Sequence, residues 1–189
     1  MFRIIPSHLS QAFCVFLFAL SANATASPAG VIPYACVSGD PYVLLAFDPV
    51  NDRVGYAAFG GGRVGQETIA ETAAREFHEE TRCVFDTPTA EELERLTPSE
   101  QKGFYSFVAE VPFISILEIP EHSCDARIER YDWQWVRLSD LNTGLNFGGA
   151  RPQVLVSLMH KTITLWEGAA ASIRKAINDG LLDPNKVCQ

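Results

Sequence analysis

The chain has 189 residues, of which 47% are apolar and 20% are charged, and its formal net charge is −8. This length suits one domain with its own hydrophobic core and is short for two. The apolar and aromatic content excludes an intrinsically disordered chain. The acidic balance argues against binding to a nucleic-acid duplex, because such binding depends on Lys and Arg side chains that neutralise phosphates.

The first 26 residues have the three parts of a secretory signal peptide. Residues 1–11 contain Arg3 and no acid, residues 12–20 form an apolar run, and residues 21–26 contain two small-x-small patterns. The run is shorter than the roughly 20 residues that span a membrane. We therefore expect cleavage after Ala26, a secreted or periplasmic mature domain at 27–189, and no stable membrane insertion. A buried N-terminal helix is the alternative.

The chain has five cysteines, and removal of the predicted signal peptide would leave four. Cys14 lies in the apolar run, and the mature domain keeps Cys36, Cys83, Cys124 and Cys188. In an oxidising compartment these four are predicted to form two disulfides, with three connectivities open. Four buried thiols that never meet are the alternative. The absence of C-x-x-C spacing argues against a zinc or thioredoxin-like site.

Past the signal peptide, strand and helix patterns alternate within one domain. Runs rich in Val, Leu, Tyr and Phe predict strands at 30–36, 42–48, 55–59, 104–113 and 131–138. Apolar residues at helical spacing predict a helix at 66–81, and Thr87 begins a second, acidic helix. The tail at about 151–178 is predicted to be mostly helical. Helices on both sides of a mixed sheet indicate an α/β sandwich in three layers.

Carboxylates gather on one face of the helix predicted at 66–81. Glu76, Glu79 and Glu80 have i, i+3 and i+4 spacing, so they project from nearly one side and repel one another. A hard divalent cation would remove that penalty, since it readily takes carboxylate oxygens. Arg75, four residues before Glu79, can brace the cluster. A solvated acidic helix face is the ordinary alternative for such a pattern.

The segment before this helix suits an anionic ligand. Glu67 lies at the helix start, at the positive end of the macrodipole. Gly61 and Gly62 let the backbone turn tightly and approach a ligand closely.

The whole spacing from Gly61 to Cys83 resembles the 23-residue signature of the Nudix hydrolases, a loop–helix–loop. The matching positions are Gly61, Glu67, the run Arg75-Glu76-Phe77-His78-Glu79-Glu80, and the apolar Cys83. Flanking segments between Gly30 and Leu141 are also similar to this family. The departure is Arg82, where the family has glycine.

The resemblance implies a Nudix-like α/β/α sandwich with a mixed β-sheet, and Mg²⁺- or Mn²⁺-dependent hydrolysis of a nucleoside diphosphate linked to another moiety. By position it implies metal ligands at Glu76, Glu79 and Glu80, with Glu79 and Glu80 in catalytic roles. Glu67 would be an auxiliary ligand or would support the loop. Metal ions that bridge a diphosphate neutralise its developing charge and orient the attacking water. A Nudix-fold module that binds a nucleotide or a protein partner without hydrolysis is the alternative function.

Arg75, together with Gly61 and Gly62, would support the site. The usual glycine at the position of Arg82 ends the helix in a left-handed conformation, which costs another residue roughly 1 kcal/mol. We therefore expect an altered helix exit with the chemistry retained, in which Arg82 or Cys83 anchors the following loop differently.

The general base is predicted outside this segment. Glu129, just before the strand at 131–138, is the first candidate, with Glu121 and Asp125 behind it. Acids in such loops are more often simply solvated, which is the alternative for each. Tyr131, Trp133 and Trp135 could stack on a nucleobase, but alternating aromatic positions on a strand are more typical of a core.

Overall fold

The computed structural model describes residues 27–121, 124 and 129–189. The predicted signal peptide with Cys14, and the candidate base Asp125, lie outside these residues. No helix within the described ranges is long and apolar enough to cross a membrane.

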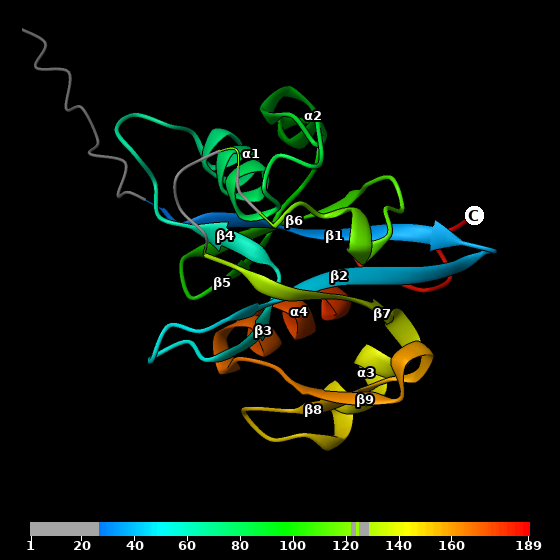
Figure 1. The fold of residues 1–189 in the computed structure, drawn as a ribbon. Helices are drawn as coiled ribbons and strands as arrows, with labels where there is room; N and C mark the ends of the chain where they lie inside the picture. Colours follow the sequence, from blue (N-terminus) through cyan, green and yellow to red (C-terminus); the bar gives the residue numbers. More distant parts are fainter. Residues whose placement is uncertain (1–26, 122–123, 125–128) are drawn as a thin grey trace, which may run out of the picture.

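The described residues form one mixed, seven-stranded sheet (Figure 1). Its strands are β1 (Ala29–Val37), β2 (Asp40–Asp48), β3 (Gly55–Ala57), β4 (Phe59–Gly61), β5 (Ser99–Gln101), β6 (Phe104–Glu110) and β7 (Tyr131–Arg137). The order is β3-β2-β1-β6-β5, with β4 also paired to β1 and β7 to β2. β1 runs parallel to β6 and antiparallel to β2 and β4.

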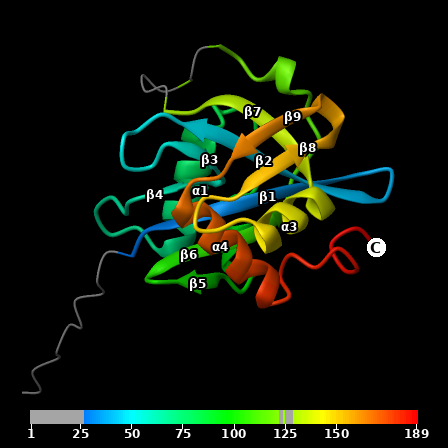
Figure 2. The same ribbon diagram turned by 90° about the horizontal axis from the view of Figure 1, so that it is seen from below.

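Helices cover both faces of this sheet. α1 (Ile69–Glu80) and α2 (Ala90–Glu94) lie on one face, and α3 (Leu138–Phe147) and α4 (Glu167–Asn178) lie on the other (Figure 1). Figure 2 shows the second face, where α4 contacts β5 and β6 and α3 contacts β2. Neighbouring side chains of β1 serve opposite cores: Val31 packs with the α1 side and Ile32 with the α4 side. The predicted three-layer α/β sandwich is confirmed.

The predicted helical tail at about 151–178 is wrong in its first half. Residues there form a hairpin of β8 (Gln153–Val156) and β9 (Lys161–Thr164), joined by the 3₁₀ turn η2 (Ser157–Met159), and only α4 is helical. Val154 and Val156 are buried while Leu155 between them is exposed, which is the two-residue period of a strand. β-branched Thr162, Ile163 and Thr164 also favour a strand.

Two further elements had no local signal. α3 begins at Leu138, and the preceding Arg137 makes no capping hydrogen bond with its side chain, so the sequence contains no capping signal for the start of this helix. β5 is three residues long, too short to show a period. A second 3₁₀ turn, η1 (Ile116–Glu118), precedes the segment that leads into β7.

The four cysteines among the described residues form two disulfides, which selects one of the three open connectivities. Cys36 pairs with Cys188, with 5.6 Å between their Cα atoms, and Cys83 pairs with Cys124, with 5.9 Å. The alternative of four separate thiols is therefore wrong. The first bond ties the C-terminal segment to the end of β1, and the second ties the end of α1 to the chain that leads into β7.

Candidate active site

The start of α1 is stabilised by contacts within a few residues of it. Thr68 caps the helix, and Glu71 completes a capping box by accepting from the Thr68 amide. Glu67 accepts from the Val64 amide at 2.9 Å and from Arg75 Nε at 2.7 Å. The Arg75 guanidinium lowers the pKa of Glu67 to about 2. With its oxygens engaged in this way, Glu67 is placed to support the loop.

Arg75 joins the start of α1 to its acidic face. Its Nη1 donates to Glu76 at 3.0 Å and to Glu79 at 3.2 Å, and its Nη2 donates to the Gly62 carbonyl at 2.8 Å. The Glu67 carboxylate, and that of Glu76 to a smaller extent, raise the pKa of Arg75 above its ordinary value. Arg75 therefore links the glycine segment to the glutamates of α1.

Gly61 and Gly62 differ in what they allow. A Cβ on Gly61 would lie 2.6 Å from the carboxyl carbon and both oxygens of Glu76, so a larger residue would displace that carboxylate. A Cβ on Gly62 would meet no described atom within 4 Å. Gly61 therefore packs against the Glu76 carboxylate, whereas Gly62 contributes its carbonyl to Arg75.

The three glutamates of the acidic face lie in different surroundings. The Glu79 side chain is 37% exposed, that of Glu76 12% and that of Glu80 4%. Burial raises the pKa of Glu76, and the charges of Glu79 and Glu129 raise it further, while Arg75 opposes the shift. That interaction places the exposed Glu129 near the cluster. Glu76 and Glu79 thus keep repulsive charge that a cation would relieve.

Glu80 is held by two donors of the protein itself. Its Oε2 accepts from the Gly60 amide at 2.7 Å, and its Oε1 accepts from Arg130 Nη2 at 2.7 Å. Burial raises the pKa of Glu80 to about 7, and Arg130 opposes this. Arg130 Nη1 also lies 2.5 Å from an oxygen of Asp48, and both residues are buried. The sequence analysis did not identify Asp48 and Arg130 as site residues, because no local pattern connects residues so far apart in the chain.

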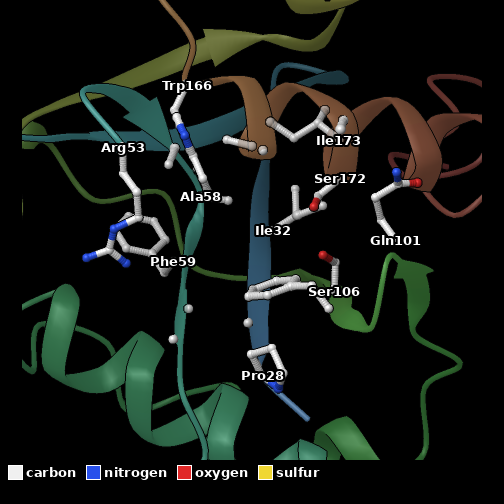
Figure 3. A pocket seen from close by; sticks show the side chains of 18 of the residues that line it. Pro28, Ile32, Arg53, Ala58, Phe59, Gln101, Ser106, Trp166, Ser172 and Ile173 are labelled. Atoms are coloured by element: carbon white, nitrogen blue, oxygen red, sulfur yellow. The ribbon is translucent and has the colours of Figure 1, made fainter. Parts of the chain in front are cut away.

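A cavity of about 560 Å³ lies beside the glycine segment, on the face of the sheet that α4 covers (Figure 3). Its walls come from β1, β3, β4, α4 and the hairpin of β5 and β6. Most of the wall residues are apolar, and some are polar. The apolar ones labelled in Figure 3 include Ile32, Ala58, Trp166 and Ile173, and the polar ones include Gln101, Ser106, Ser172 and Arg53. Gly60, Gly61 and Gly62 also line the cavity. The glycine segment therefore contacts both the cavity and the carboxylates of α1.

Of the three aromatic residues considered for stacking, the two tryptophans lie in the core, as the alternative predicted, and Tyr131 is 44% exposed. Trp133 and Trp135 are 8% and 6% exposed, and Trp135 Nε1 donates to the Ile114 carbonyl at 2.8 Å. The hypothesis that these tryptophans stack on a nucleobase is therefore wrong. Trp166, which the sequence reasoning did not single out, lines the cavity instead. His78 is exposed on the side of α1 that faces away from Glu76 and Glu80, and its Nδ1 lies 3.2 Å from the Phe85 carbonyl.

The expected alteration of the helix exit is wrong. Arg82 itself adopts the left-handed conformation, with φ of 57°, and Cys83 follows with 59°. The Cys83 amide donates to the His78 carbonyl at 2.8 Å and the Arg82 amide to that of Glu79 at 3.0 Å, the two bonds of a Schellman motif. The exit keeps the geometry that glycine ordinarily provides, and the Arg82 side chain is free to contact the following loop.

Comparison with known proteins supports the fold assignment. No profile of a known protein family matches the sequence. A MutT/nudix family protein from Enterococcus faecalis is similar in structure with a TM-score of 0.50 and 15% identity, covering 95% of this chain and 65% of that one. The chain has the Nudix hydrolase fold. RenU, a Nudix hydrolase from M. Smegmatis, matches with a TM-score of 0.49 and 18% identity, covering 84% of this chain and 88% of its own.

One curated sequence is similar over a short stretch. The uncharacterized protein L534 of Acanthamoeba polyphaga mimivirus is 46% identical over 61 residues, which make up 30% of this chain. The match spans 20% of that protein's length.

Proposed function

We propose that this protein is a Mg²⁺- or Mn²⁺-dependent pyrophosphohydrolase that cleaves a nucleoside diphosphate linked to another moiety. The observation that carries the proposal is the position of Gly61, which contacts the Glu76 carboxylate and also lines the cavity. A substrate that places its organic half in the cavity would bring its diphosphate to the glutamates.

The donor set fits a hard divalent cation. Glu76 and Glu79 offer carboxylate oxygens to such an ion. Burial raises the pKa of Glu76, and the charges of Glu79 and Glu129 add to that shift. These residues would hold the ion, with Glu80 contributing from its buried position and Glu67 supporting the loop. When bound, the ion would neutralise charge on the diphosphate and make a water molecule more acidic.

The chain's own groups would bind and orient the substrate. The cavity volume of about 560 Å³ lies in the range of small-molecule sites. Trp166 offers an indole surface to a nucleobase, and Gln101, Ser106 and Ser172 offer hydrogen bonds. Arg53 also lines the cavity and offers positive charge to an anionic substrate. Glu129, exposed and close enough to influence Glu76, is the candidate to accept a proton from water.

The test is turnover of a substrate panel. ADP-ribose, NADH, dinucleoside polyphosphates, nucleoside triphosphates and capped RNA would be incubated with the protein and Mg²⁺ or Mn²⁺, and products resolved by chromatography. We expect at least one to be cleaved, and Glu79→Gln to lower kcat/KM roughly 100-fold, as losses around metal sites do. Glu94→Gln, an exposed glutamate of α2, is the matched control and should keep full activity. Equal rates for the wild type and Glu79→Gln on every substrate would contradict the proposal.

Binding without hydrolysis is the second candidate, and the engagement of Glu80 by Arg130 favours it. In that case calorimetry would show a nucleotide bound by the wild type and by Glu79→Gln alike, with no product formed.

We further propose that residues 1–26 are a signal peptide and that the domain at 27–189 works outside the cytoplasm. Two disulfides fit an oxidising compartment. Expression of the full chain and sequencing of the mature N-terminus should find Ser27 first. A cytoplasmic product that begins at Met1 would contradict export.

A further inference from the structure

We propose that Arg82 is a positioning residue for this site: from the end of α1 it holds the chain at Pro120 and Arg130, and so sets Arg130 against Glu80. The inference rests on the proposed function only where activity is measured. Its other measurements are independent of turnover.

The Arg82 side chain occupies a buried position, in contact with backbone carbonyls and with an aromatic ring. Its Nη2 donates to the Arg130 carbonyl at 3.1 Å, and its Nη1 donates to the Pro120 carbonyl. The guanidinium carbon lies 4.3 Å from the centroid of the Trp133 ring, so the cation is stacked on an indole as well. Arg82 is only 8% exposed. Glycine, which the Nudix signature has here, could make none of these contacts.

A continuous series of contacts leads from Arg82 to the glutamates. The backbone of Arg130 is held by Arg82, and its side chain binds Glu80 at 2.7 Å and Asp48 at 2.5 Å. The other oxygen of Glu80 accepts from the Gly60 amide. Gly60 precedes Gly61, which touches Glu76. A shift of the Arg130 backbone would therefore reach both the glycine segment and the acidic face.

The position of Arg130 needs such support because its partners are deeply buried. Asp48 and Glu80 have side chains 3% and 4% exposed, and an ion pair in such surroundings loses heavily when one partner moves away. Arg130 lies just before β7, where the ladder with β2 begins at Tyr131. Arg82 therefore fixes the backbone at a point that the sheet does not yet hold. The neighbouring Cys83–Cys124 disulfide is a second tether from the same helix end.

The decisive variant is Arg82→Gly, which restores the usual residue of the signature. It also removes the cost of a side chain on a residue with left-handed backbone conformation. We expect kcat to fall about 10- to 100-fold, the range typical of groups that orient metal ligands. KM should rise as well, because Arg130 and Gly60, whose positions depend on Arg82 in this proposal, line the cavity. Mn²⁺ affinity, measured by electron paramagnetic resonance, should fall about tenfold. The Gly60 amide should exchange its hydrogen faster, because its acceptor Glu80 is no longer held.

Two further variants separate positioning from stability. Arg82→Lys keeps a donor that can reach one of the two carbonyls, so it should recover part of kcat and of Mn²⁺ affinity. Arg174→Ala is the matched control: Arg174 also donates to backbone carbonyls, those of Leu145, Gly148 and Gly149, but far from α1. It should lower the melting temperature without changing kcat or Gly60 exchange.

Unchanged Mn²⁺ affinity and Gly60 exchange in Arg82→Gly would overturn the inference. An equal loss of kcat in Arg174→Ala would overturn it too, because general destabilisation would then explain the effect. If the wild type cleaves no substrate, the proposed function fails, while Mn²⁺ affinity and Gly60 exchange still decide the role of Arg82.

Discussion

The two ends of α1 are held in opposite ways. At its start, Glu67 and Arg75 are eight residues apart and partly exposed. At its exit, Arg82 reaches the Arg130 carbonyl 48 residues away, and the Glu80–Arg130 pair is buried. Residues close in the sequence stabilise the start of α1, whereas its exit is stabilised by a distant segment that precedes β7. The comparison teaches that one short motif can combine a locally determined half with a half that only folding completes.

The largest expected effect comes from removing the buried cation at the exit. Arg130→Met removes the cation shared by Asp48 and Glu80 and leaves Asp48 only its longer contact of 3.5 Å with Arg53. Losing one member of a buried ion pair costs about 3–5 kcal/mol. Urea denaturation should show this loss in the free energy of unfolding. Arg95→Met, which breaks an exposed pair with Glu91, should change that free energy by less than about 1 kcal/mol. Similar losses in both variants would remove the contrast between buried and exposed pairs.

The disulfide at the exit should come next. Replacing Cys83 and Cys124 by serine opens a loop that spans 41 residues, and such bonds typically contribute about 2–4 kcal/mol. Thermal unfolding of the double variant should show a lower melting temperature than that of the wild type. An unchanged melting temperature would show that Arg82 and Arg130 suffice at this end of α1.

The cap at the start should matter less. Thr68→Ala removes the capping side chain of α1, which typically costs about 1 kcal/mol. Chemical denaturation would measure the loss, and Thr89→Ala, which removes the matching capping box of α2, provides a comparison within the same chain. A loss as large as that of Arg130→Met would mean that the start, too, depends on distant contacts.

The smallest effect concerns the pH dependence of the start. Arg75 lowers the pKa of Glu67 from 4.5 to about 2, so the stabilisation from this carboxylate is present above pH 4.5 and is lost as the pH falls toward 2. The difference in free energy of unfolding between the wild type and Glu67→Gln should therefore shrink between pH 5 and pH 2, as titrated by denaturation at fixed ionic strength. A difference that is constant across this range would contradict the Glu67–Arg75 pairing.

Most of the fold could be predicted from the hydrophobic pattern of the sequence, and the errors arose where the local sequence signal was short or missing. β1, β2, β6, β7 and α1 have clear strand or helix periods, so their positions were predicted within a few residues. The hairpin of β8 and β9 was mistaken for a helix because its strands are four residues long, and a short apolar run fits either period. α3 lacked a cap.

The sequence by itself determined the acidic face of α1, because helix geometry places residues at i, i+3 and i+4 on one side wherever the helix lies. Only the tertiary structure decided what lies opposite that face. The antiparallel register that sets Phe47 against Tyr131 brings the next residues, Asp48 and Arg130, together beside Glu80. Such a contact depends on the pairing of strands far apart in the chain, which no local spacing encodes.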